Sequence, residues 1–207
     1  MDLKSFHKIS YGLYLISSNT EEKQNGCISN TVIQVSSKPA KLSVALSKDN
    51  LTTDIIRKSR HFTATILSQA VSMDVIGEFG FKSGKDINKF DKFNANTDNF
   101  GTKYISDNMN AVFSCKVVEC VDVGTHIMFI GEVEEAEVLS DQPVMTYEYY
   151  HQVKNGTTPK NSPLYQSETK KTGYRCTICG YINETDVLPE GYICPICGNP
   201  EEYFEQI

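Results

Sequence analysis

Two CxxC pairs near the C-terminal end constrain this 207-residue chain more than any other feature. Cys176 and Cys179 form the first pair, and Cys194 and Cys197 form the second, with fourteen residues between the two pairs. Two such pairs can bring four sulfur atoms to one point, as a tetrahedral thiolate site for iron or zinc requires. A glycine follows each pair and lets the backbone curl so that amide N–H groups point at the sulfurs. The alternative is two disulfides or four inert thiols, and the matched CxxCG units argue against it.

The residues around these pairs resemble a rubredoxin domain. The matching features are Tyr174, the sequences CxxCGY and CPxCG, and a closing EEYF at 201–204. The resemblance implies one iron ion on four cysteines that exchanges a single electron. Tyr192 stands where rubredoxins usually have tryptophan, and a zinc ribbon uses much the same spacing, so zinc remains the alternative metal. Ile178 and Ile196, inside the two pairs, are expected to shield the metal from water.

Composition places the rest of the chain among globular proteins. Hydrophobic residues make up 40% and charged residues 22% of the sequence, which is typical of a folded protein. No apolar run approaches the roughly 20 residues of a membrane span, and the first ten residues lack the apolar core of an export signal. Seven cysteines, an odd number with four in metal spacing, indicate a reducing compartment. We therefore expect a cytoplasmic protein that does not bind a membrane.

Negative charge is concentrated at the C-terminal end. Residues 173–207 carry a net charge of −5, out of −6 for the whole chain. An acidic surface attracts basic partners and repels nucleic acid, so no nucleic-acid partner is expected. The alternative is that this charge only keeps the protein in solution.

The hydrophobic pattern predicts a mainly β fold, in which short strands alternate with turn residues. The expected strands are one that begins near Gly12, 27–37, 41–47, 61–68, and two long runs between 109 and 139 that are divided at 122–124, with a further break near Gly131. This pattern is typical of a small closed or sandwiched β-barrel.

Helices, loops and domain limits complete the prediction. The expected helices are a short one within 3–16, one within 48–59 with Asp49 or Asn50 as N-cap, and 72–80 with Ser72 as N-cap. Residues 81–108 are polar and are expected to form a loop or a lid. The segment 154–172 is rich in Pro, Gly, Ser and Thr and is expected to be a flexible linker. It divides a barrel domain at 1–153 from a rubredoxin-like domain at 173–207.

Ordered motifs in the first part resemble the flavin reductase-like family. The motifs are NGxxxNT at 25–31, KDNLTT at 48–53, FGFKSGKD at 79–86, KF at 89–90 and VGTHIMFIGEVEEAEV at 123–138. The resemblance implies a six-stranded split β-barrel with short helices, a homodimer, and FMN bound near the dimer interface. Together with the small C-terminal metal-ribbon domain, it gives a two-domain protein.

The same resemblance implies three groups of FMN-binding residues, each of which has a simpler alternative. The expected phosphate site, otherwise a helix cap with a solvated lysine, comprises Ser47, Lys48, Asn50, Thr52 and Thr53. The expected ring-edge segment, otherwise a hairpin turn, comprises Asn25, Gly26, Cys27, Ile28, Ser29, Asn30 and Thr31. The expected cover of the pocket, otherwise a surface loop, comprises Phe79, Gly80, Lys85 and Asp86.

One histidine and three further cysteines are candidates for roles in catalysis. By resemblance, His126 lies near the flavin and the nicotinamide and is the catalytic candidate, although a histidine at the start of a strand is often structural. Cys27 is more simply a buried thiol than a redox group. Cys115 and Cys120 differ in strand parity, so they are expected to face opposite sides and to be inert.

The two parts together resemble the high-molecular-weight rubredoxin family. The resemblance implies an oxidoreductase that passes electrons from NAD(P)H, directly or through a reductase, to FMN, then to the iron and on to a protein acceptor. A flavodiiron protein that reduces oxygen or nitric oxide is the implied acceptor. The sequence contains no GxGxxG fingerprint, so any NAD(P)H would bind directly over the flavin.

Two other functions fit the sequence. In one, the protein supplies reduced flavin to another enzyme, and a zinc ribbon forms a structural tail. In the other, the barrel only carries electrons that it receives from a separate reductase.

Overall fold

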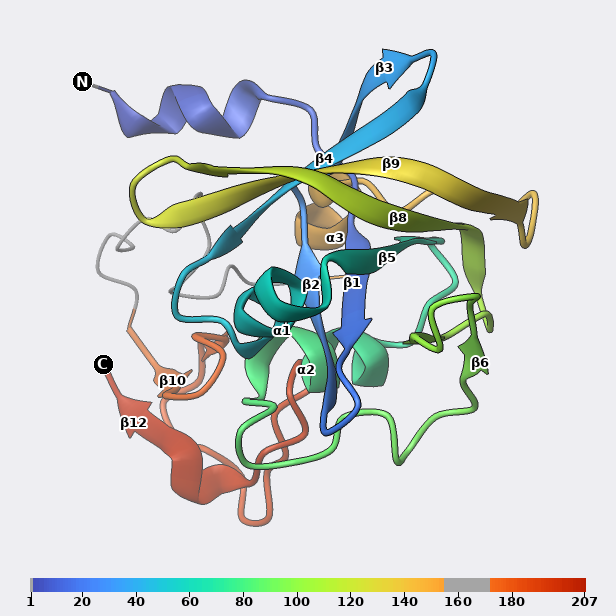
Figure 1. The fold of residues 1–207 in the computed structure, drawn as a ribbon. Coiled ribbons are helices and arrows are strands. Elements are labelled where there is room, and N and C mark those ends of the chain that lie inside the picture. Colours follow the sequence, from blue (N-terminus) through green and yellow to red (C-terminus); the bar gives the residue numbers. More distant parts are fainter. Residues whose placement is uncertain (1, 155–171) are drawn as a thin grey trace.

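The computed structural model describes residues 2–154 and 172–207. It contains a curved antiparallel sheet with helices packed beside it, followed by a small C-terminal module, drawn in red in Figure 1. The predicted mainly β class is confirmed. Residues 155–171, most of the expected linker, lie outside the described residues. Among the described residues, no helix is both long and apolar enough to cross a membrane.

Seven strands form the main sheet, in the order β2-β1-β5-β8-β9-β4-β3. Their bounds are β1 (Tyr14–Asn19), β2 (Gln24–Ser29), β3 (Ile33–Ser37), β4 (Ala40–Ser47), β5 (His61–Leu67), β8 (Met109–Asp122) and β9 (His126–Val138). Residues of β2, at one edge, contact β4, next to the other edge, so the sheet curls back towards itself. A separate two-stranded hairpin joins β6 (Asn96–Thr97) to β7 (Lys103–Tyr104).

The expected single strand over 27–37 is wrong, because this stretch is divided between β2 and β3. Thr31 lies at the division. Its hydroxyl donates to the Ala45 carbonyl at 2.8 Å and accepts from the Ala45 N–H at 3.1 Å. The Thr31 side chain thus satisfies both backbone groups of Ala45 where the ladder between β3 and β4 has ended. This division gives the sheet seven strands, where six were expected.

The expected break near Gly131 is also wrong, since β9 runs through this residue without interruption. A Cβ atom on Gly131 would lie 2.6 Å from the Phe62 ring and 2.8 Å from the Cys115 Cβ. The glycine therefore allows buried side chains to lie directly on the strand. Phe62 and Cys115 belong to the core inside the curved sheet, and complete burial of a large apolar side chain such as Phe62 contributes about 1.5–3 kcal/mol.

Two helices flank the sheet near its β1–β2 edge. Helix α1 (Leu51–Ser59) begins where the Asn50 side chain accepts from the Thr52 N–H at 2.9 Å, so Asn50 is the N-cap. Helix α2 (Met73–Phe81) follows Ser72, whose side chain makes no capping hydrogen bond. Val75, Ile76 and Phe79 of α2 face a second apolar core.

A third helix, α3 (Tyr147–Gln152), has Thr146 as its N-cap and is rich in aromatic residues. Two short 3-10 helices cover Leu3–Lys8 and Glu201–Tyr203. The polar segment after α2 is mostly loop, as predicted, apart from the β6–β7 hairpin.

A buried lysine ties this loop to the barrel. Lys89 is only 3% exposed, and its Nζ donates to the carbonyls of Gly26 at 3.0 Å and Phe79 at 3.2 Å. Burial lowers the pKa of Lys89, and the nearby Cys27 and Glu78 oppose this shift. Gly26 belongs to β2 and Phe79 to α2, so one ammonium group links the two elements.

The C-terminal module is a three-stranded sheet in the order β11-β10-β12. Its strands are β10 (Tyr174–Cys176), β11 (Ile182–Asn183) and β12 (Phe204–Gln206). Gly173 and Ile207 exchange two backbone hydrogen bonds, at 3.3 and 2.8 Å, and so close the two ends of the module on each other. The Tyr192 ring packs edge-on against Phe204 at 5.3 Å, as a hydrophobic partner inside the module.

Candidate functional site

A pocket opens between the edge of the sheet and the helices α2 and α3. It encloses about 670 Å³ of empty space, counted with its open mouth. Its lining comprises Leu13, Cys27, Ile28, Ser29, Asn30, Ala45, Leu46, Ser47, Asn50, Ile76, Gly80, Phe81, His126, Tyr147 and Tyr150.

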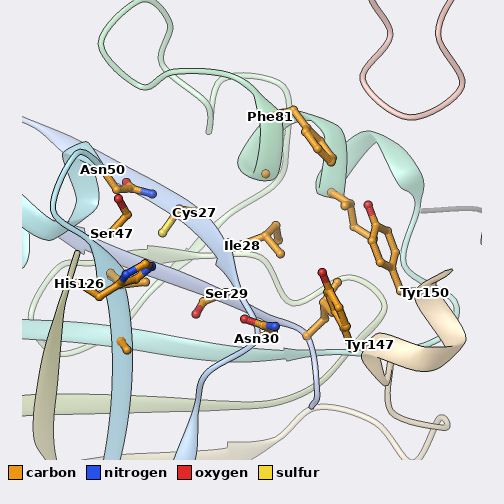
Figure 2. Close-up of a pocket in the computed structure, with 15 residues that line it drawn as sticks. Cys27, Ile28, Ser29, Asn30, Ser47, Asn50, Phe81, His126, Tyr147 and Tyr150 are labelled. Atoms are coloured by element: carbon orange, nitrogen blue, oxygen red, sulfur yellow. The ribbon is translucent and has the colours of Figure 1, made fainter. Parts of the chain in front are cut away.

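The pocket has a polar end and an aromatic end. Figure 2 shows Ser47, Asn50 and His126 at one end, and Phe81 with the two tyrosines of α3 at the other. Residues 27–30 of the β2 segment lie between the two ends. A ligand with a charged tail and a flat ring would therefore find a suitable surface at each end.

The polar end is built where β4 ends, β9 begins and α1 begins. Ser47 pairs with His126 across the two strands, and the Thr53 hydroxyl donates to the Ser47 carbonyl at 2.7 Å. His126 is buried, and its Nδ1 lies 2.8 Å from the Thr125 hydroxyl. Asn50 caps the first turn of α1, and the partial positive charge at this end of the helix favours an anion such as phosphate.

Asn30 provides the strongest sign that the middle of the pocket receives a ligand. Its side chain is 7% exposed, and the Nδ2 group has no hydrogen-bond partner. A buried donor without a partner costs about 1–3 kcal/mol, so such groups are rare unless a ligand completes them. The ring edge of a flavin presents carbonyl and ring-nitrogen acceptors, which this donor fits.

Cys27 lines the same part of the pocket and is fully buried in the interior. Burial raises the pKa of its thiol, although hydrogen bonding with Thr52 and the charge of Lys89 oppose the shift. A thiol with a raised pKa is a poor nucleophile, which agrees with a packing role.

The structure brings only some of the expected FMN-binding residues to the pocket lining. Those that reach it are Cys27, Ile28, Ser29, Asn30, Ser47, Asn50, Gly80 and, from the catalytic assignment, His126.

Several expected residues lie behind the lining instead. Asn25 donates to the Thr52 hydroxyl at 3.0 Å, and both are buried. Thr31 bridges to β4, and Lys48 forms an exposed ion pair with Asp122 at 2.8 Å. The other residues outside the lining are Gly26, Thr53, Phe79, Lys85 and Asp86.

Aromatic residues of the lining were not assigned from the sequence. Phe81 ends α2, whereas Tyr147 and Tyr150 lie on α3, far along the chain from the other lining residues. The two tyrosines are three positions apart and therefore share one face of α3. This spacing was the available signal, but nothing in the sequence says that α3 lies over the pocket.

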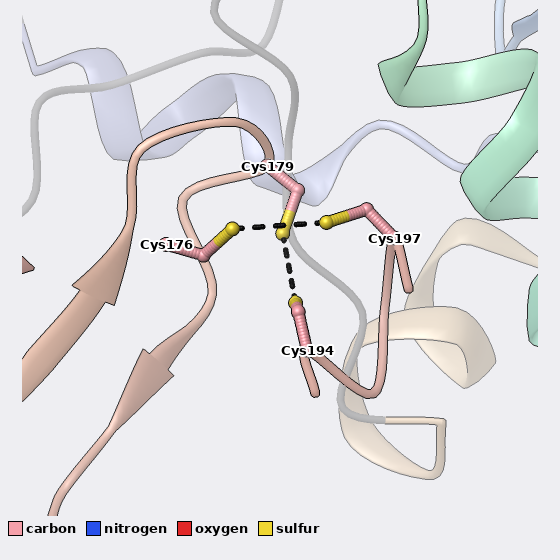
Figure 3. A group of neighbouring side chains, drawn as sticks. All are labelled: Cys176, Cys179, Cys194 and Cys197. Atoms are coloured by element: carbon pink, nitrogen blue, oxygen red, sulfur yellow. Dashed lines mark hydrogen bonds between the residues drawn. The ribbon is translucent and has the colours of Figure 1, made fainter. Parts of the chain in front are cut away.

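The four cysteines of the C-terminal module converge on one point (Figure 3). All four Sγ atoms lie within 4.8 Å of one another, with 3.7 Å between Cys176 and Cys197 and 3.5 Å between Cys179 and Cys194. A tetrahedral site with metal–sulfur bonds of about 2.3 Å has sulfur–sulfur edges of about 3.8 Å. The cluster therefore has the size and the donor set of a four-thiolate metal site.

The expected tight turns at the cysteine pairs are present. The N–H groups of Gly180 and Gly198 donate to the carbonyls of Cys176 and Cys194, at 2.8 and 2.9 Å. Both glycines have positive φ, 81° and 69°, which other residues rarely adopt. The Asn199 side chain also donates to the Cys197 Sγ at 3.1 Å, a type of contact that tunes the potential of a bound metal.

The two isoleucines inside the pairs differ in exposure. Ile196 is 3% exposed and shields the cluster as expected, whereas Ile178 is 41% exposed. The expectation that both cover the metal is therefore wrong for the first pair.

Comparison with known protein families matches both parts of the chain. Residues 6–157 match the model of the flavin reductase like domain, and residues 174–205 match that of the rubrerythrin, rubredoxin-like domain.

Individual relatives match over most of this chain. A high molecular weight rubredoxin of Moorella thermoacetica is 41% identical over 88% of this chain and 82% of its own length. A ferric-chelate reductase (NAD(P)H) of Archaeoglobus fulgidus is 41% identical over 80% of this chain and 98% of its own length. Among solved structures, an NADH:FAD oxidoreductase of Streptomyces globisporus has a TM-score of 0.62 at 18% identity, over 69% of this chain and 84% of that one. The last comparison concerns the fold alone.

Proposed function

The chain belongs to the flavin reductase-like family and ends in a rubredoxin-like domain, and from this we infer that it is an electron-transferring oxidoreductase. It takes electrons from a reduced nicotinamide, directly or through a reductase, and passes them through FMN to a mononuclear iron on four cysteines. A protein acceptor then receives them one at a time. Each NAD(P)H oxidised to NAD(P)⁺ gives up two electrons, so it supports two deliveries to the acceptor.

One observation carries this proposal: a pocket with a polar end and an aromatic end and a closed four-thiolate site occur in the same chain. The four cysteines already supply the four ligands of a tetrahedral site, so no coordination position is left for a substrate. A metal held in this way can stabilise structure or carry electrons. The rubredoxin-like match favours iron and electron transfer.

In this proposal the polar end of the pocket holds the FMN phosphate. Ser47 and Asn50 lie beside the N-terminus of α1, where backbone N–H groups attract an anion. Lys48, Thr52 and Thr53 support this end from behind the lining. Bound FMN supplies the chemistry that the side chains lack, because it accepts a hydride and releases electrons singly.

The segment 25–31 runs along the ring edge of the bound flavin. Asn30 uses its unpartnered Nδ2 to donate to a ring acceptor, and the other members of the segment fix its position. His126 is assigned to the nicotinamide side, where it orients the hydride donor. Gly80 borders the cavity, and Phe79, Lys85 and Asp86 belong to the segment that covers it.

Partners follow from the relatives and from the surface. A relative that is 41% identical, the NAD(P)H ferric-chelate reductase of Archaeoglobus fulgidus, favours a nicotinamide donor. Ile33 and Val35 of β3 are 62% and 46% exposed, which suits a second copy of the chain packed on this edge of the sheet. A flavodiiron protein as acceptor rests on family resemblance alone.

The test is an optical and metal analysis of the whole protein, followed by anaerobic mixing with NADH and with NADPH. We expect a red protein that contains iron, whose flavin and iron absorption both bleach without any added protein. The Cys176→Ser variant should lose the iron signal and keep its flavin.

Two results would contradict the proposal. A colourless module that contains zinc would instead favour a flavin reductase with a structural tail. Iron that stays oxidised after the flavin has bleached would show that no electrons pass from the flavin to the metal.

A further inference from the structure

All four cysteines are buried, but the isoleucine inside the second pair is covered whereas the isoleucine inside the first pair is exposed. Ile178 and Ile196 occupy the same position in their CxxC pairs, yet they are 41% and 3% exposed. Figure 1 shows α2 between the sheet and the red C-terminal module. The asymmetry of the two pairs therefore has its cause outside the module, in the packing against α2.

Gly77 is the point of closest approach between the two parts. A Cβ atom at this position would lie 2.5 Å from the Ile196 carbonyl oxygen and 3.2 Å from the Cys197 Cα. Gly77 lies inside α2, where glycine costs about 1 kcal/mol relative to alanine. Its backbone is helical, so the helix itself does not require a glycine there. The backbone of the second cysteine pair does require one.

Two side chains extend this contact along the helix. Met73 and Phe81 both pack against the four-cysteine cluster. With Gly77 they are spaced by four residues, so the three lie in a row on one face of α2, which we call the metal-facing row. Phe81 is, within the described part of the chain, the residue that both packs on the cluster and lines the flavin pocket.

We propose that the metal-facing row is a docking surface that holds the second cysteine pair against the wall of the flavin pocket and so sets the electron route through α2. This inference deepens the proposed function and rests on it. Electron transfer slows steeply as the separation of two centres grows, so a fixed contact through Phe81 keeps the transfer rapid. The exposed Ile178, inside the first pair, marks the side of the cluster that stays available to the external acceptor.

The contact itself can be measured without following the reaction. In full-length protein with ¹³C-labelled methionine methyl groups, ferric iron should broaden the Met73 signal, and zinc in the same site should leave it sharp. Met128, on β9, serves as an internal reference. A sharp Met73 signal in the iron-loaded wild-type protein would overturn the proposal.

Matched variants separate docking from damage to either part. Gly77→Leu places a side chain where the Ile196 backbone lies, whereas Asp74→Leu adds the same side chain at an exposed position of α2. Ile196→Ser and Ile178→Ser make the same change at a buried and at an exposed isoleucine. We expect Gly77→Leu and Ile196→Ser to sharpen the Met73 signal of the iron-loaded protein. The two partner variants should leave it broad.

The same variants test the electron route. After anaerobic mixing with the nicotinamide, Gly77→Leu should reduce its flavin at the wild-type rate. Overpacking of this kind shifts an equilibrium by roughly 5- to 150-fold, and the bleaching of iron should slow by a similar factor. Unchanged iron bleaching in both Gly77→Leu and Ile196→Ser would overturn the proposal. If the wild-type iron never bleaches, the proposed function fails, whatever the Met73 signal reports about the contact.

Discussion

Replacing Asn30 with leucine should stabilise the flavin-free protein and weaken its binding of FMN. The Nδ2 group of Asn30 is buried without a partner, and such a donor costs about 1–3 kcal/mol of stability. Leucine has a similar shape and removes this penalty. In a chain of this size, each kcal/mol raises the melting temperature by about 2–4 °C. If FMN completes the hydrogen bond, its loss should raise the Kd by roughly 5- to 150-fold.

Asn25→Leu is the matched control for this prediction. Asn25 is equally buried, but its Nδ2 donates to the Thr52 hydroxyl at 3.0 Å. The same substitution there leaves the Thr52 hydroxyl without this partner and should lower the stability of the flavin-free protein by about 1–3 kcal/mol. Thermal unfolding of the apoproteins and fluorescence titration with FMN measure both effects. A destabilised Asn30→Leu apoprotein, or an unchanged Kd, would refute the assignment of Asn30 to the flavin ring.

Other sites give further tests. Cys194→Ser should remove the iron, seen by metal analysis, while FMN fluorescence titration remains normal. His126→Gln should slow flavin reduction by NAD(P)H about tenfold, or 1.4 kcal/mol, in stopped-flow measurements without releasing FMN. Iodoacetamide should label the exposed Cys120 but not Cys115, because burial raises the pKa of Cys115 to about 12, and mass spectrometry would show this. Burial lowers the pKa of His61 below 6.5, so the folded state binds this proton less well than the unfolded state. Stability should therefore be full above pH 6.5 and fall as the pH drops below it, more in the wild type than in His61→Gln, in melting curves against pH.

Local signals in the sequence were enough to find the metal site and most of the secondary structure. The cysteine pairs carry their own spacing, and Asn50 is a recognisable cap before an amphipathic helix. The division of 27–37 was not predictable, because it depends on the Thr31 hydroxyl meeting Ala45 from another strand. Gly131 looked like a turn signal, but its role comes from Phe62, which lies almost 70 residues earlier in the chain. Each error arose where a distant partner outweighed a local preference.

The flavin pocket was predictable only where it follows contiguous motifs. Resemblance pointed to the 27–30 segment and to the polar end, which line the pocket, and their binding of FMN stays a prediction. Phe81 and the tyrosines of α3 were not found, because they reach the pocket through the packing of helices. The contact between Gly77 and the second cysteine pair was not predictable either, because the sequence around a single glycine in a helix does not indicate which residues pack against it.

The buried ammonium group of Lys89 has a consequence for both cofactor sites. From inside the barrel, the ammonium group donates to a carbonyl of β2 and to a carbonyl of α2. If α2 moved away from the sheet, this buried cation would lose a hydrogen-bond partner in an apolar interior. β2 leads into the flavin pocket, and α2 carries the face on which the cysteine cluster rests. Under the proposed function, the distance between the flavin and the metal is therefore set by a contact inside the first domain. Lengthening or shortening the linker should alter how often the two domains come into contact. It should not alter the distance between the flavin and the metal once the domains are in contact.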